Sequence, residues 1–148
     1  MSLVVQQGLT AGGGVSAASQ AEQETATEAG KYVAPATQQF HPSAAKFWAE
    51  LSTSGTLNAS YNVTSRTDTG VGDETITIAT DFSSANWAAF VTGGQGTVHT
   101  TAGTNKGTGV TSKAAGSIIG RCWDSLSNAS GALVDPGVPW GFLGLGDR

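Results

Sequence analysis

The chain has 148 residues, of which 21 are glycine, and charged residues make up only 12% of it. Seven basic against eleven acidic residues give a net charge of −4, so no basic stripe is available to neutralise a phosphate backbone, and we expect no nucleic-acid partner. The composition is typical of a loop-rich β protein and unlike that of a helical bundle. No apolar run approaches the roughly 20 residues of a membrane helix, and the first residues lack the pattern of a signal peptide. We therefore expect a protein that folds in a cytoplasm without inserting into a membrane.

The N-terminal stretch, residues 1–40, differs from the remainder in having few large apolar side chains, and it cannot build a core by itself. Within it, Ser19 and Glu22 have the spacing of a capping box, and Gly30 follows as a stop, which predicts a short helix. The apolar residues of this helix are alanines, so it needs something to pack against. Residues 31–39 are expected to run extended because Pro35 restricts the residue before it. We predict an anchoring and oligomerisation arm at 1–40 and a β domain at 41–148.

The stretch HPSAAKFWAEL, residues 41–51, fits two structures. Pro42 could open a helix, which would place Phe47 and Leu51 on one face. As a strand, Phe47, Ala49 and Leu51 would point one way, and Lys46, Trp48 and Glu50 the other. The local pattern leaves both alternatives open.

From about residue 45 onward, runs with strand-like alternation are separated by turns at intervals of eight to twelve residues, as in an antiparallel sandwich or barrel. The run at 58–68 places Ala59, Tyr61 and Val63 on one side. Residues 74–80 are predicted to pair back onto 60–66 as a hairpin around a turn at 70–73. Further strands are expected near 85–94, 116–125 and 132–146, with coil where prolines gather near residue 137. Residues 96–113 are expected to supply two polar strands or a long arm rich in threonine and glycine.

Three stretches resemble a module that recurs near the C-terminus of many bacteriophage tail-fibre and related virion proteins. HPSAAKFWAEL and ASYNVTSRTDTGVGDETITIATDF are similar to its HPSAAKAW…SYNVSSITDNGTGDYTVNF pattern, and SNASGALVDPGVPWGFLGLGD to its closing turn and last strand. ASQAEQETATEAGKYVAPATQ is similar to the linkers that join fibre modules, so the resemblance covers residues 19–148. It favours a strand at 46–51. It also implies an all-β, antiparallel β-sandwich of fibre-tip type with an extended N-terminal arm containing a short helix.

Few side chains suit catalysis. His41 and His99 stand apart, without a second histidine or an acidic cluster at metal-ligand spacing. Asp73 and Glu74 are adjacent carboxylates, which makes them candidates for glycoside hydrolysis. Neighbouring residues on a strand face opposite ways, however, and the sequence favours Asp73 as a turn residue. Cys122 stands alone, which excludes an internal disulfide, and it is expected to be buried. We predict no enzyme activity, no catalytic residue, no metal and no cofactor.

The four tryptophans are the remaining signal, because a flat aromatic side chain supplies large contact area at low entropy cost. Trp87 and Trp123 lie in apolar runs and are expected in the core. Trp48 and Trp140 are the candidates for contacts with another subunit or a receptor. A polar loop that includes Thr104, Asn105 and Lys106 is the other candidate contact.

These observations predict a non-enzymatic virion protein, a small fibre or fibre-tip module that forms a homotrimer and contacts a glycan or protein of the host surface. The N-terminal arm would bind other virion proteins. The alternative is a head fibre, capsid decoration or tail-assembly protein with a purely structural attachment role. In either case the protein would be made in the host bacterial cytoplasm and end in the virion.

Overall fold

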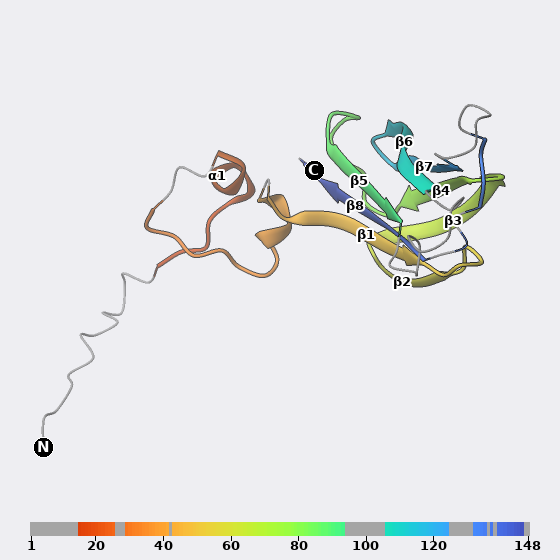
Figure 1. Cartoon of the computed structure of the whole chain (residues 1–148). Helices are drawn as coiled ribbons and strands as arrows, with labels where there is room; N and C mark the ends of the chain where they lie inside the picture. The colour runs from red at the N-terminus through yellow and green to blue at the C-terminus, as the bar shows by residue number, and fades with distance from the viewer. Residues whose placement is uncertain are drawn as a thin grey trace, which may run out of the picture. The chain divides into compact units, whose positions relative to one another are not determined.

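The computed structural model describes residues 15–25, 29–41, 43–93, 106–124, 132–135, 137 and 139–146. The chain divides into two compact units between residues 41 and 42, called here the N-terminal unit and the β unit. Figure 1 shows the helical turns of the first and the strands of the second. Each unit is described separately.

The N-terminal unit contains a short helix, α1 (Gln20–Thr25), and a 3-10 turn, η1 (Gln38–Phe40). The predicted capping box is confirmed. The Ser19 amide donates to Glu22 Oε2 at 2.8 Å, and the Glu22 amide donates to Ser19 Oγ at 3.4 Å. Gly30, expected to stop the helix, lies in a bend beyond the described helix. The helix therefore begins where the sequence indicated.

Among the described residues of this unit, the strand-like pairing is one parallel bridge, between Ala17 and Tyr32. The Ala18 amide donates to the Tyr32 carbonyl at 2.9 Å, and Lys31 forms an ion pair with Glu22. After Ala34 the chain turns into η1, so the expectation of an extended run through residue 39 holds only for its first part. Local polar contacts, and not a sheet, hold these residues together.

The β unit is an all-β antiparallel sandwich, as predicted. Its two four-stranded sheets have the orders β2-β1-β8-β5 and β3-β4-β7-β6, and all pairs are antiparallel. The strands are β1 (Ala45–Leu51), β2 (Leu57–Tyr61), β3 (Val63–Gly70), β4 (Asp73–Ile78), β5 (Ala88–Gly93), β6 (Lys106–Ala114), β7 (Ser117–Asp124) and β8 (Trp140–Leu145).

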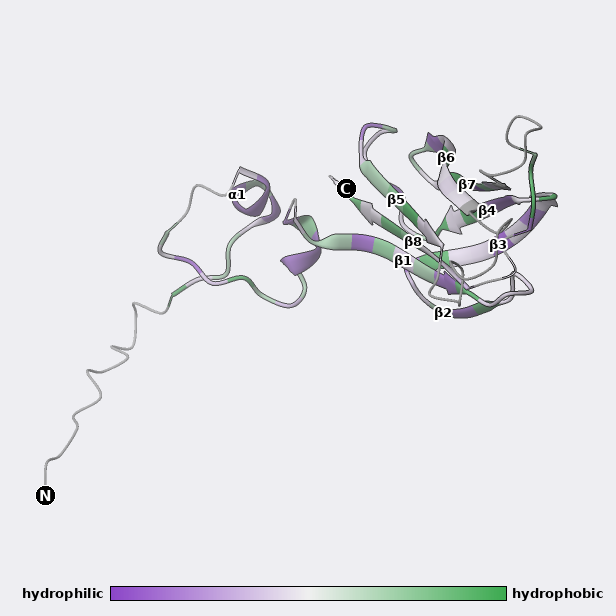
Figure 2. Ribbon diagram, in the orientation of Figure 1, coloured by the Kyte–Doolittle hydropathy of each residue, from purple (hydrophilic) through white to green (hydrophobic). Residues whose placement is uncertain are grey.

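The core lies between the inner faces of the two sheets. Each inner face is made by every second residue of its strands, and Figure 2 shows the alternation of hydrophobic and polar residues along β1. One contiguous cluster fills the space, made of Phe47, Ala49, Leu51, Ile76, Ile78, Phe82, Trp87, Ile118, Cys122, Trp140 and Phe142. The predicted burial of Cys122 is confirmed.

Residues 45–51 form a strand, so the alternative helix is excluded. Phe47, Ala49 and Leu51 are buried and Trp48 and Glu50 are exposed, as the strand pattern requires. Lys46 departs from the expectation, because it is buried beside the irregularity in pairing between Ala45 and Phe47.

The predicted hairpin is confirmed in β3 and β4, with Arg66 opposite Ile76 and Gly70 opposite Asp73. The expectation of one run through 58–68 is wrong, because the chain changes sheets at Asn62, whose φ is 56°. Asparagine tolerates this left-handed conformation. Its side-chain amide donates to the Lys46 carbonyl at 2.9 Å and its oxygen accepts from the Thr80 amide at 2.9 Å. Asn62 thus stabilises the corner between β2 and β3.

Gly120 is expected to be intolerant of a methyl group. A Cβ at this buried position of β7 would lie 2.3 Å from the Phe142 ring of the opposite sheet. Gly120→Ala should therefore lower the free energy of unfolding by about 1–3 kcal/mol, measured by urea denaturation. Gly93→Ala is the matched control, because its Cβ would meet Thr108 at an ordinary 3.6 Å. Equal stability of the two variants would contradict the packing described for the core.

Candidate functional site

The outer face of the sheet β2-β1-β8-β5 carries a row of apolar side chains in direct register. Tyr61 of β2 is opposite Trp48 of β1, Trp48 is opposite Leu143 of β8, and Leu143 is opposite Phe90 of β5. One residue from each strand contributes, so the row crosses the whole sheet. We call these four residues the aromatic row.

The aromatic row faces solvent in the isolated chain. Trp48 is 39% exposed, Tyr61 44% and Phe90 50%, while Leu143 between them is partly buried. Residues directly opposite on paired strands have neighbouring side chains. The register therefore places three exposed aromatic rings and a leucine next to one another on one face, unlike apolar residues scattered singly over a surface.

The neighbouring row on the same face contains three small residues and one glutamate. It consists of Ala59, Glu50, Gly141 and Thr92, which are opposite one another in the same strand order. Glu50 is the one charged residue of these two rows. A partner could therefore lie against the aromatic row without burying a charge from within it.

Trp48 is exposed as the sequence analysis expected, and its role as a contact residue stays a prediction. Trp140 is only 1% exposed, so it offers no exposed surface to another subunit, which corrects that part of the expectation; a contact with a small ligand stays a prediction. Trp140 begins β8 on its inner face, two residues before Phe142, whose ring lies 5.4 Å away centroid to centroid. Its ring is part of the core and cannot serve as a flat external contact.

The two tryptophans assigned to the core have different environments. Trp87 is 3% exposed, so its prediction is confirmed. Trp123 is only partly buried, because it follows the inward-facing Cys122 and lies on the other face of its sheet. A Cβ at Gly107 of the adjacent strand β6 would be 2.4 Å from the Trp123 ring, so the ring lies directly on that glycine.

The structure describes only part of the polar loop that is predicted to make contacts. Thr104 and Asn105 lie outside the described residues, as does His99. Lys106 begins β6, and the structure does not describe its side chain. The role of this loop as a contact therefore stays a prediction.

The acidic pair Asp73–Glu74 is separated by the strand geometry. Asp73 begins β4 and pairs with Gly70, so it closes the hairpin turn as expected, and its carboxylate accepts two hydrogen bonds from Arg121, at 2.7 and 2.6 Å. Glu74 points to the inner face and pairs with Arg66. Burial raises the pKa of Glu74, although the hydrogen bond from Arg66 opposes this. The two carboxylates do not converge on one reacting centre.

The Asp73–Arg121 ion pair should make the free energy of unfolding depend on pH. The hydrogen bonds from Arg121 hold the pKa of Asp73 below its usual value. The ion pair therefore stabilises the folded state fully above about pH 3.9, the usual pKa of an aspartate. This stabilisation is lost as the pH falls through the lowered pKa of Asp73 in the folded state. Arg121 is 38% exposed, so solvent screening keeps the effect small. Arg121→Gln should lower the free energy of unfolding at pH 6, and the difference from the unmodified chain should shrink as the pH falls below the usual pKa of an aspartate. A difference that does not shrink with falling pH would contradict the assignment.

No protein-family model, curated protein or solved structure matches the chain. Among the described residues, no group of three or more His, Cys, Asp or Glu side chains is placed to hold a metal ion. No helix in the described part of the chain is long and apolar enough to cross a membrane. Function must therefore be inferred from the geometry of the chain itself.

Sequence reasoning identified one member of the aromatic row and missed three. The sequence places Tyr61 on the same side of its strand as Ala59, but it does not show that this side faces solvent. Leu143 and Phe90 are ordinary apolar strand residues in the sequence. Their alignment with Trp48 depends on the pairing of strands that are distant along the chain, which local periodicity does not encode.

Proposed function

We propose that the chain is a non-enzymatic structural protein of a bacteriophage virion, a small fibre or fibre-tip module that associates as a homotrimer and contacts the host surface. The aromatic row is the observation that carries this proposal. An exposed band of Trp, Tyr, Leu and Phe across a sheet favours a permanent protein contact, because aromatic anchors supply most of the energy of such interfaces.

A second copy of the chain is the proposed occupant of the aromatic row. The chain has only 12% charged residues, so a surface on another copy can meet the row without burying many charges. Closed symmetric assemblies are the usual outcome of self-association in soluble proteins. The trimeric state itself follows from the resemblance of residues 19–148 to phage fibre modules.

The proposed absence of catalysis is supported by how the acidic residues are used. Asp73 is bound to Arg121 and Glu74 to Arg66, so each carboxylate of the adjacent pair is engaged by an arginine on its own side of the sheet. A glycosidase requires two carboxyl groups that converge on one bond. Incubation with host capsular polysaccharide should release no new reducing ends.

The N-terminal unit is proposed to bind other virion proteins. Among its described residues, only Ala18 and Gln23 are buried, whereas Val15, Tyr32 and Val33 are at least half exposed. This surface supports the alternative role as well, that of a head fibre, capsid decoration or tail-assembly protein whose task is attachment alone. Both roles place the protein on the particle.

The experiment that tests the proposal is the analysis of purified particles of the encoding phage. We expect the protein to co-purify with virions through a density gradient, at a copy number that is a multiple of three by quantitative mass spectrometry. Antibody labelling in the electron microscope then distinguishes the two roles, because a fibre tip is labelled at the tail and a decoration protein over the capsid. Absence of the protein from purified particles would overturn both.

A further inference from the structure

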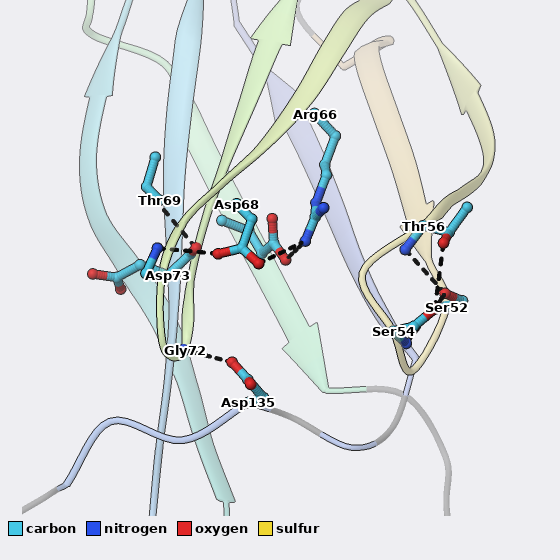
Figure 3. A network of polar contacts seen from close by, with 11 residues as sticks. Ser52, Ser54, Thr56, Arg66, Asp68, Thr69, Gly72, Asp73 and Asp135 are labelled. Carbon is cyan, nitrogen blue, oxygen red and sulfur yellow. Dashed lines mark hydrogen bonds and ion pairs between the residues drawn. The ribbon is translucent and has the colours of Figure 1, made fainter.

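A polar pocket of about 80 Å³ opens at one end of the β unit, apart from the aromatic row. The turn between β1 and β2 forms one wall, and side chains of β3, β4 and β8 form the others. It is lined by Thr53, Ser54, Gly55, Arg66, Asp68, Glu74, Asp135 and Trp140. Figure 3 shows the polar network at this end, with Arg66 directed toward Asp68 and Asp135 beside the Gly72 turn.

The pocket has a buried floor and an exposed rim. The Glu74 side chain is 8% exposed and Trp140 is 1% exposed, so both lie at the bottom. Thr53, Ser54 and Asp68 are exposed and surround the entrance. The rim is therefore open to solvent, and the buried polar groups lie beneath it.

Three polar atoms at this pocket are buried and have no hydrogen-bond partner among the described residues. Two are donors, Arg66 Nε and Trp140 Nε1, and one is an acceptor, Glu74 Oε2. All three belong to residues that line the same cavity. Buried polar atoms are normally paired, so their concentration here indicates a site built for a ligand that both donates and accepts.

The β1–β2 turn packs directly against the Arg66–Glu74 ion pair at the wall of the pocket. Gly55 has a φ of 76°, and a Cβ at this position would lie 2.1 Å from Arg66 Nη2 and 2.7 Å from Glu74 Oε1, so only glycine fits here. The turn is held by Ser52, whose hydroxyl accepts from the Thr56 amide at 3.0 Å.

We propose that this pocket binds two adjacent hydroxyl groups of a neutral polyhydroxy ligand, of which a sugar ring is the representative class. A hydroxyl group both donates and accepts. One hydroxyl can donate to Glu74 Oε2, and the hydroxyl oxygens can accept from Arg66 Nε and Trp140 Nε1. The cavity admits the hydroxylated edge of a ring, while the remainder of the ring lies at the Thr53–Ser54 rim.

The charge of the pocket selects for a neutral ligand. Three carboxylates, those of Asp68, Glu74 and Asp135, surround the single guanidinium of Arg66. An anionic sugar would meet this excess of negative charge. A cationic ligand would leave the two N–H donors, Arg66 Nε and Trp140 Nε1, without an acceptor.

This inference depends on the pocket and not on the virion assignment. Binding is measured on the purified full chain, so it can fail while the protein is still found on phage particles, and it can succeed if the protein is not. The competing occupant is ordered water, which could also pair with the three atoms.

The test uses matched probes and the indole N–H signal of Trp140 in ¹H–¹⁵N correlation spectra, assigned with Trp140→Phe. We expect trans-1,2-cyclohexanediol and neutral methyl glycosides to shift this signal saturably, with dissociation constants on the order of 1–10 mM for such small ligands. Cyclohexanol, which lacks the second hydroxyl, should bind at least about tenfold more weakly, and N-acetylneuraminic acid should not bind. If no diol moves the Trp140 signal at 100 mM, the pocket holds water only and the proposal is wrong.

Variants distinguish a loss of ligand binding at the pocket from a loss of the folded structure. In ligand-observed saturation-transfer experiments, Trp140→Phe and Glu74→Gln should each weaken diol binding by about tenfold or more. Trp87→Phe is the matched control, because it removes an indole donor from the core away from the pocket and should leave binding unchanged. The backbone spectrum shows whether each variant is folded. Ser54→Ala, at the exposed rim, supplies a second variant that spares the core and should weaken binding by a few-fold. Unchanged binding in all pocket variants would overturn the proposal.

Discussion

Trp87→Ala is expected to lower the free energy of unfolding by about 3–5 kcal/mol, the range for loss of a large buried aromatic. Trp87 stacks on Phe82 with centroids 4.4 Å apart and meets Phe47 edge-on at 5.6 Å. Its indole N–H donates to the Ala114 carbonyl of β6 at 3.0 Å, and Lys113 lies over its ring. Trp87 precedes β5 of one sheet and forms a hydrogen bond to β6 of the other. Its removal should therefore weaken the packing between the two sheets.

Chemical denaturation of the full chain provides the measurement. Trp87→Phe is the control, because it keeps most of the ring packing while losing the hydrogen bond to Ala114, and it should cost about 1–2 kcal/mol. A Trp87→Ala variant within 1 kcal/mol of the unmodified chain would show that the two sheets are not joined through this side chain.

The double variant Trp48→Glu, Phe90→Glu is expected to abolish self-association without unfolding the chain. Central aromatic residues of an interface each contribute about 2 kcal/mol or more, so their replacement by charges should weaken association by at least about 100-fold. Both side chains are exposed, at 39% and 50%, so the fold should tolerate the change. Size-exclusion chromatography with light scattering reports the mass, and circular dichroism reports the fold.

The matched control adds the same two charges to an exposed strand of the other sheet, as Ser65→Glu, Thr67→Glu on β3. This variant should keep the mass of the unmodified protein. If both double variants dissociate alike, net charge and not the aromatic row governs association. If neither dissociates, the row is not the interface.

Local features of the sequence predicted a large part of the fold. The capping box of Ser19 and Glu22, the β3–β4 hairpin and the alternation in β1 all depend on residues close together in the chain. In β1 the alternation fits a helix as well, and only the resemblance to fibre modules favoured the strand. Polar turns between short alternating runs indicate an antiparallel sandwich or barrel, and the resemblance to fibre modules favoured the sandwich.

The errors have physical causes that lie beyond local pattern. The run at 58–68 alternates smoothly in the sequence, yet the left-handed conformation of Asn62 sends its two halves to different sheets. Trp140 lies just after the proline-rich stretch near residue 137, and its aromatic side chain suggested an external contact. The pairing of Trp140 with Leu51 on one side and Gly93 on the other places it inside the sandwich instead.

Neither candidate site could be found from the sequence alone. The aromatic row requires the register of four strands, and the pocket requires that Arg66, Glu74 and Trp140 come together from β3, β4 and β8. Such contacts are set by tertiary pairing. Trp48 was predicted as a contact because of its residue type, which can be read from the sequence, whereas strand pairing cannot.

The proposed symmetric assembly of identical copies can be measured as a mass in solution, by sedimentation equilibrium of the unmodified full chain from about 1 to 100 μM. We expect a species of three times the 14.9 kDa chain mass across this range. A single species of one chain mass at every concentration would show that the chain does not associate with itself.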